Sequence, residues 1–148
     1  MANFKIVISD PKKGKSMQKE ARDDAAQPFI GMKIGDKFKG ELLDLAGYEF
    51  QITGGSDFAG FPMRKDVPGT VRNKILGVKG VGITNKKKHK KKTVKGLRTM
   101  DGMRQRVTMA GNTVFDKTAQ INVKILKEGS AKLEFVDKPK EAKPAEAK

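Results

Sequence analysis

The middle of the chain contains the run Ile52-Thr53-Gly54-Gly55-Ser56-Asp57-Phe58-Ala59-Gly60-Phe61-Pro62-Met63. Glycines and a proline stand there beside Ser56 and Asp57, a mixture that indicates a strand end followed by compact turns. Glycine accepts a positive φ and lets a second backbone or a phosphate come close. Phe58 and Phe61 are suited either to anchor such a loop on a core or to stack against a nucleobase. Composition alone leaves both interpretations open.

The same run resembles the signature of the small-subunit ribosomal protein six family of archaea and eukaryotes. In that signature an apolar and a small residue precede Gly-Gly-x-Asp-x-x-Gly-x-Pro-Met. The matching positions, called the signature below, are Ile52, Thr53, Gly54, Gly55, Asp57, Gly60, Pro62 and Met63. The resemblance covers roughly residues 4–127 and implies a small, β-rich, barrel-like body. It also implies a structural role in the small ribosomal subunit and binding to ribosomal RNA.

Two later segments extend the resemblance, namely 106–112 and 120–125. Ala110 stands where the family pattern implies a basic residue, and 93–105 looks like additional sequence before this element. The long basic C-terminal helix with its serine phosphorylation cluster, typical of eukaryotic members, has no counterpart in this sequence. The resemblance therefore implies a short protein of the archaeal type.

Positive charge is concentrated in one part of the chain. The formal net charge is +15 over 148 residues, yet residues 1–60 hold 9 Lys/Arg and 9 Asp/Glu. Residues 61–106 hold 15 Lys/Arg and only 2 Asp/Glu. Charge that served solubility alone would be spread more evenly. This basic segment, 61–106, predicts an anionic partner and is called the extension below.

Several classes of protein are disfavoured by what the sequence lacks. With no cysteine, disulfides, cysteine-ligated zinc and thiol nucleophiles are excluded. The amino terminus does not resemble a signal peptide, and no window holds the ~18–20 apolar residues of a membrane span. The only histidine, His89, lies among lysines, and neither glycine-rich stretch fits a nucleotide-binding pattern. We therefore expect an intracellular protein with no catalytic activity, no metal, no cofactor and no small-molecule substrate. The resemblance implies a cytoplasmic location on the ribosome.

Alternating apolar and polar residues predict short strands along most of the chain. They are expected at 4–8, 36–43, 48–53, 71–76, 93–98, 106–109 and 121–125, the last pairing with 133–135. Residues 15–27 are ambiguous: Met17, Ala21 and Ala25 share a helical face, whereas the resemblance implies a second strand near 15–20, which we favour. The expected fold is mainly β, a small barrel-like or strongly bent antiparallel sheet with a long basic loop extension. We expect one domain over 1–136 and a disordered tail over 137–148.

The cationic side chains of the extension are the candidate RNA-binding residues. They are Arg64, Lys65, Arg72, Lys74, Lys79, Lys86, Lys87, Lys88, His89, Lys90, Lys91, Lys92, Lys95, Arg98, Arg104 and Arg106. Lysines this dense repel one another in water, and phosphate contacts relieve that repulsion while releasing counterions. The alternative to RNA binding is that the lysine run is an import signal or a merely solvated tail. Its position between two expected strands argues against a tail. Because Phe61 is the only aromatic residue in the extension, recognition of double-helical RNA by backbone and shape is favoured.

The sequence thus predicts a structural constituent of the small ribosomal subunit that binds ribosomal RNA and contacts neighbouring ribosomal proteins. The competing hypothesis is a free-standing RNA chaperone or ribosome assembly factor. A membrane-surface binder is disfavoured because no amphipathic helix flanks the lysines.

Overall fold

Two strands from opposite ends of the chain lie side by side in the middle of the sheet. In the computed structural model, which describes residues 2–88 and 96–129, β1 (Asn3–Asp10) pairs in parallel with β9 (Thr118–Lys127). Ile6 lies opposite Ile121, and Ile8 lies opposite Val123. Alternate residues of both strands are buried, which is the pattern of strands that turn one face to a core.

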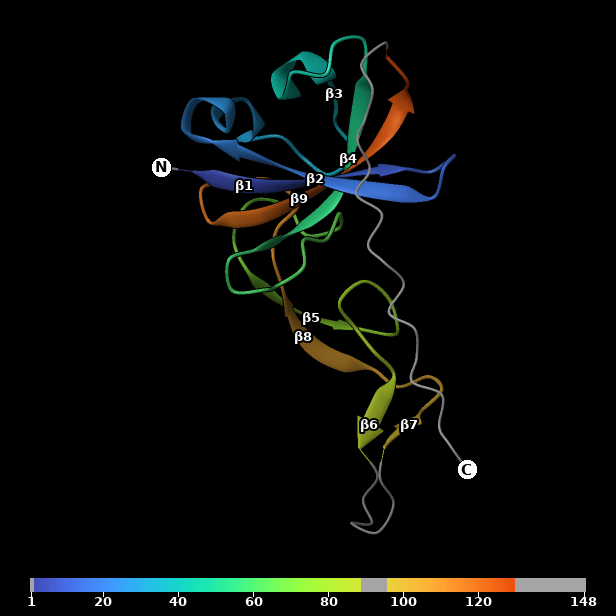
Figure 1. The fold of residues 1–148 in the computed structure, drawn as a ribbon. Coiled ribbons are helices and arrows are strands. Elements are labelled where there is room, and N and C mark those ends of the chain that lie inside the picture. The colour runs from blue at the N-terminus through green and yellow to red at the C-terminus, as the bar shows by residue number, and fades with distance from the viewer. Residues whose placement is uncertain (1, 89–95, 130–148) are drawn as a thin grey trace, which may run out of the picture.

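Three further strands complete a five-stranded sheet with the order β2-β1-β9-β4-β3 (Figure 1). Antiparallel pairing joins β2 (Lys15–Arg22) to β1, β4 (Glu49–Asp57) to β9, and β3 (Lys37–Lys39) to β4. The prediction of a mainly β fold is confirmed. Within the described residues the sheet is open, not closed into a barrel, and it is mixed because β9 runs in the same direction as β1.

One apolar cluster covers a face of this sheet. Its fully buried large side chains include Phe4, Ile6, Ile8, Phe29, Phe50, Ile52, Ile121 and Val123. Burying side chains of this size stabilises the fold by about 1.5–3 kcal/mol each. The rings of Phe29 and Phe38 meet edge to face at 5.2 Å between centroids, and Phe38 lies 5.5 Å from Phe50. The body of the protein is therefore organised around a small, aromatic-rich core.

Residues 15–22 form a strand, as favoured from the sequence, and the helical alternative is wrong. The turn that joins β1 to β2 closes through a hydrogen bond from the Gly14 N–H to the Asp10 carbonyl, with Gly14 at φ +65°. Met17 and Ala21 both face the core, and their spacing of four fits a strand as well as a helix. Two short 3-10 helices follow, η1 (Asp23–Ala25) and η2 (Gln27–Phe29).

The strand expected over 36–43 is shorter than predicted. β3 ends at Lys39, and residues Gly40–Leu43 form the 3-10 helix η3. The Leu45 N–H donates to the Gly40 carbonyl, and a Cβ at Gly40 would overlap the Leu45 carbonyl oxygen. The chain therefore folds back on itself at Gly40 instead of continuing along the sheet.

The extension and the three residues after it form two antiparallel ribbons that lie beyond the sheet (Figure 1). The first pairs β5 (Asn73–Gly77) with β8 (Gln105–Met109), and the second pairs β6 (Lys86–Lys88) with β7 (Leu97–Thr99). A second apolar cluster of Val67, Ile83 and Met109, with Ile75 and Val107 against it, supports the first ribbon. The strands predicted at 71–76 and 106–109 are thus found with boundaries shifted by one or two residues.

Other predictions concern residues outside the described part of the chain. These are the start of the strand expected at 93–98, the pairing of 121–125 with 133–135, and the tail at 137–148. Within the described residues, β9 pairs with β1 on one side and with β4 on the other.

Candidate nucleic-acid interface

The signature begins inside β4 and shapes the contact between β4 and β9. Ile52 pairs with Val123 and Gly54 with Asn122, so Thr53 is an extra residue that makes a β-bulge. A Cβ at Gly55 would overlap the Gln120 carbonyl oxygen of β9, whereas a Cβ at Gly54 would meet no atom within 4 Å. Gly55 is thus required for strand packing, and Gly54 leaves bare backbone on the surface.

Asp57 organises the turn that follows β4. Its carboxylate is buried, and Oδ1 accepts hydrogen bonds from the backbone N–H groups of Ala59, at 3.0 Å, and Phe61, at 2.9 Å. The Gly60 N–H donates to the Asp57 carbonyl, and Gly60 has φ +82°, a conformation that glycine adopts without strain. Gly60 is therefore required for its backbone conformation, and not for a close approach of another group, because the space around its Cβ position is open.

The last two signature residues connect the body to the extension. The Met63 N–H donates to the Gly55 carbonyl, and the Ala110 N–H donates to the Pro62 carbonyl, both at 2.9 Å. A Cβ at Gly82 would lie 2.5 Å from Pro62 Cγ, so the extension packs directly on the signature. Ala110 is buried in the main core, which explains why it is not a basic residue here.

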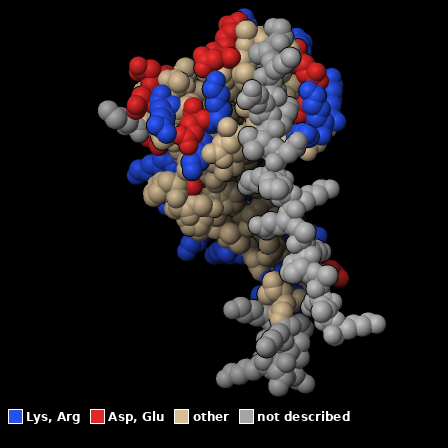
Figure 2. All heavy atoms as spheres, viewed as in Figure 1, with Lys and Arg blue, Asp and Glu red and all other residues tan. Residues whose placement is uncertain are grey.

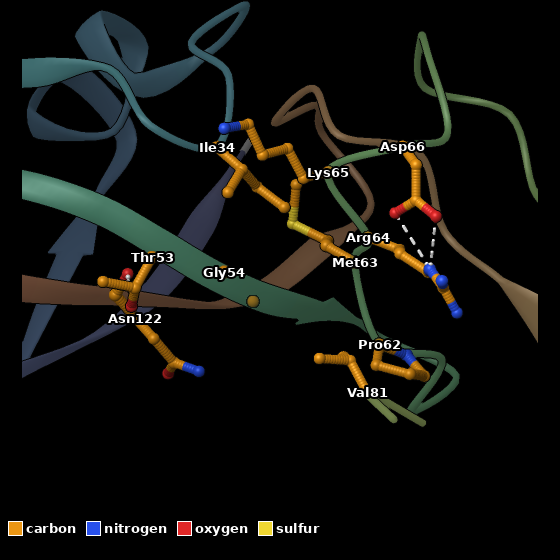
Figure 3. A pocket seen from close by; sticks show the side chains of 11 residues that line it. Ile34, Thr53, Gly54, Pro62, Met63, Arg64, Lys65, Asp66, Val81 and Asn122 are labelled. Atoms are coloured by element: carbon orange, nitrogen blue, oxygen red, sulfur yellow. Dashed lines mark hydrogen bonds and ion pairs between the residues drawn. The ribbon is translucent and has the colours of Figure 1, made fainter. Parts of the chain in front are cut away.

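A groove of about 480 Å³ runs beside the signature (Figure 3). Gly54 lies along it on β4, with Thr53 and Asn122 at one end and Pro62 and Arg64 at the other. The Thr53 hydroxyl is occupied, since it donates to the Asn122 carbonyl at 3.0 Å. The groove thus combines exposed backbone with both polar and apolar side chains.

Arg64, at the rim of this groove, is paired. Its Nε lies 2.9 and 2.8 Å from the two carboxylate oxygens of Asp66, which Figure 3 marks with dashed lines. This hydrogen bond lowers the pKa of Asp66 from its ordinary value. The pair contributes its stabilisation above the ordinary carboxyl pKa and loses it as the pH falls through the lowered one. The neighbouring Lys65 is exposed.

Arg72 has a structural role in addition to any RNA contact. Its Nε lies 2.6 Å from Asp57 Oδ2, and its guanidinium lies 5.2 Å from the ring centroid of Phe58 and 5.0 Å from that of Phe61. A carboxylate and two aromatic rings therefore fix this cation.

The β5–β8 ribbon turns two predicted cations to one side. Cross-strand pairs place Lys74 opposite Thr108 and Leu76 opposite Arg106, so Lys74 and Arg106 share the outer face. We call these two residues the basic face; both are exposed. The other side of the ribbon carries Ile75 and packs on the second cluster. Strand alternation thus separates the charged face from the supporting one.

The β6–β7 ribbon carries the start of the lysine run. Lys87 lies opposite Arg98, and Lys86, opposite Thr99, is exposed. Arg98 is half-buried, and its Nε has no hydrogen-bond partner among the described residues. Lys88 is the last residue of β6. The predicted residues His89, Lys90, Lys91, Lys92 and Lys95 lie outside the described part of the chain.

Most described cations of the extension are available to a partner. For Lys65, Lys74, Lys79, Lys86, Lys87, Arg104 and Arg106, no carboxylate within residues 2–88 and 96–129 lies at ion-pair distance, and all seven are exposed. Figure 2 shows that acidic side chains gather on the sheet body, intermixed with basic ones. The extension is thus a separate, net positive surface.

The family model described as ribosomal protein S6e matches residues 4–137 of this chain. The chain belongs to the ribosomal protein S6e family.

Relatives similar over nearly the whole length carry the name small ribosomal subunit protein eS6. The protein of Methanoculleus marisnigri is 38% identical over 143 residues, which cover 96% of this chain and 98% of the relative. That of Methanothermobacter thermautotrophicus is 42% identical over 131 residues, covering 88% and 92%. That of Archaeoglobus fulgidus is 40% identical over 139 residues, covering 93% and 98%. The archaeal type expected from the resemblance is confirmed.

Membership of the S6e family decides two of the predictions. The family consists of structural, non-enzymatic components of the cytoplasmic ribosome, which confirms both the absence of a catalytic role and the location. Separately, no helix in the described part of the chain is long and apolar enough to cross a membrane.

Sequence reasoning noted Phe58 as a possible stacking residue but missed that it lies together with Arg72, Phe115 and Lys117. Phe58 precedes the extension, and Phe115 and Lys117 follow it, yet the fold brings all three to the same hollow as Arg72. A count of aromatic residues along the extension cannot detect them. The one signal for this hollow in the sequence was Phe58, an aromatic residue in the turn of the S6e signature.

Proposed function

We propose that this chain is a structural component of the small ribosomal subunit and that it binds ribosomal RNA through its extension. The relatives are named as proteins of this subunit, and their similarity extends over nearly the whole chain. The observation that carries the proposal is the set of exposed, unpaired cations that two ribbons hold away from a charge-balanced body. An array of this kind neutralises phosphates of nearby RNA segments and releases their counterions.

The basic face allows a direct test of the RNA contact. In the double variant Lys74→Gln/Arg106→Gln, binding to a structured fragment of small-subunit ribosomal RNA should weaken, because two phosphate contacts are lost. The slope of log affinity against log salt should fall by about 1.4–1.8, since each neutralised phosphate contributes roughly 0.7–0.9. Filter binding over a salt series measures both quantities.

A matched control removes the same charge from the body. Lys37 and Lys39 are exposed on β3, and neither has an ion pair with a carboxylate of the described residues. Lys37→Gln/Lys39→Gln should leave the salt slope nearly unchanged. Equal losses in the two double variants would mean that net charge, and not the extension, controls binding, and the proposed contact would be wrong.

The alternative, a free-standing RNA chaperone or assembly factor, predicts a different distribution in cells. A structural component should be present at one copy per mature small subunit after a moderate salt wash. Quantifying the protein across a sucrose gradient of cell lysate tests this prediction. Enrichment in precursor or light fractions alone would favour the assembly factor.

A further inference from the structure

Phe58 is an exposed aromatic side chain on a firmly bonded loop. The residue is 64% exposed, although its backbone is held in place: the Phe58 N–H donates to the Lys117 carbonyl at 3.0 Å. Two hydrogen bonds to Asp57 Oδ1 fix the residues around it. The loop is thus ordered without burying the ring, which leaves an apolar surface ready for a partner.

Arg72 fixes the position of this ring from one side. Its guanidinium lies over Phe58 at 5.2 Å, and it is itself held by the nearly fully buried Asp57 carboxylate, which is 1% exposed. Preorganised groups of this kind bind with a smaller loss of conformational freedom. The aromatic ring and the cation therefore form one prepared unit.

The surface beside Phe58 is hollowed. The hollow has a volume of about 360 Å³, and its lining residues are Phe58, Thr70, Val71, Arg72, Phe115 and Lys117. Val71 is 67% exposed, and the ammonium group of Lys117 has no carboxylate partner within the described residues. Apolar walls, one hydroxyl group and two cations thus converge on the same space.

We propose that this hollow binds one unstacked nucleobase of an RNA strand, with the base against Phe58 and an adjacent phosphate at Lys117. The inference rests on the proposed function, because the base belongs to the RNA that the extension would bind. An aromatic platform bordered by cations matches a nucleotide, which carries a π face and a negative charge a few bonds apart. A base inside a double helix has its faces covered by stacking, so the hollow selects an unpaired residue. The extension would hold helical RNA while this site reads a neighbouring unpaired nucleotide.

The chain contains no tryptophan, so a single Trp reports on the hollow. In Phe58→Trp, a short oligouridylate should quench the indole fluorescence by stacking, whereas a blunt RNA duplex of the same length should bind without quenching. Leu76→Trp is the control, because Leu76 is 54% exposed beside the basic face but outside the hollow. Quenching at position 76 as strong as at position 58, or quenching by the duplex, would overturn the proposal.

Affinity measurements separate stacking from apolar contact. Phe58→Leu keeps an apolar side chain but removes the aromatic face, so affinity for the oligouridylate should fall roughly 5- to 150-fold, the loss typical of one base–aromatic stack. Affinity for the duplex should not change, and Phe58→Tyr should retain binding to both RNAs.

The remaining outcomes distinguish this inference from the proposed function. If Phe58→Leu binds the oligouridylate as well as the wild type does, the base does not stack on Phe58 and the nucleobase site is wrong, while the extension still binds duplex. If the wild type binds neither RNA, the proposed function fails together with the site.

Discussion

At the scale of single residues, the signature divides into positions that the fold requires and positions that face outward. Gly55 and Asp57 are of the first kind, because one allows β9 to approach and the other holds the following turn through its carboxylate. Gly54 is of the second kind, because the space at its Cβ position is open. Phe58, which lies between two signature positions, also faces outward. The same short segment therefore contains residues that the fold requires and residues that remain accessible to a partner.

The adjacent glycines give a matched pair of substitutions. Gly55→Ala should lower the free energy of unfolding by about 1–3 kcal/mol, since its Cβ would overlap the backbone oxygen of Gln120 and force the strands apart. Gly54→Ala should change it by less than about 0.5 kcal/mol, because its Cβ would enter open space. Urea unfolding with an unchanged m-value measures both. A destabilisation at position 54 equal to that at position 55 would contradict the assigned roles.

At the scale of elements, the sequence predicts where strands occur better than it predicts how they pair. The period-two pattern located β1 and β9, but a parallel pair between residues 5–9 and 120–124 has no local signal. The end of β3 at Lys39 depends on a contact between Gly40 and Leu45 that alternation does not encode.

The candidate site shows the same division between local and long-range information. Charge is additive along the chain, so the extension was identified from composition. The hollow at Phe58 was not, because Phe58, Arg72 and Lys117 come from three separate segments. A pairwise property such as a cation over a ring is visible only after folding.

At the scale of the whole molecule, the body and the β6–β7 ribbon depend on different interactions. The two apolar clusters contain none of the described side chains of 86–87 and 96–99, so these residues add nothing to either core. The ribbon's sequence, 86–99, nevertheless contains 8 of the 15 Lys/Arg of the extension and no acidic residue. The apolar clusters thus stabilise the sheet and the first ribbon, whereas the β6–β7 ribbon lies beyond both (Figure 1).

This separation predicts that the ribbon can be removed without unfolding the protein. The Met100 N–H donates to the Asn85 carbonyl at 2.9 Å, so the two ends are already adjacent and an Asn-Gly turn can replace residues 86–99. The melting temperature should stay within about 4 °C of the wild type, which corresponds to less than ~1 kcal/mol. The salt slope for ribosomal RNA should fall by several units, since each lost phosphate contact removes roughly 0.7–0.9. Calorimetry measures the melting temperature, and a large drop would show that the ribbon supports the body. A salt titration on the same preparation measures the slope, and an unchanged slope would show that the lysines of the ribbon do not contact RNA.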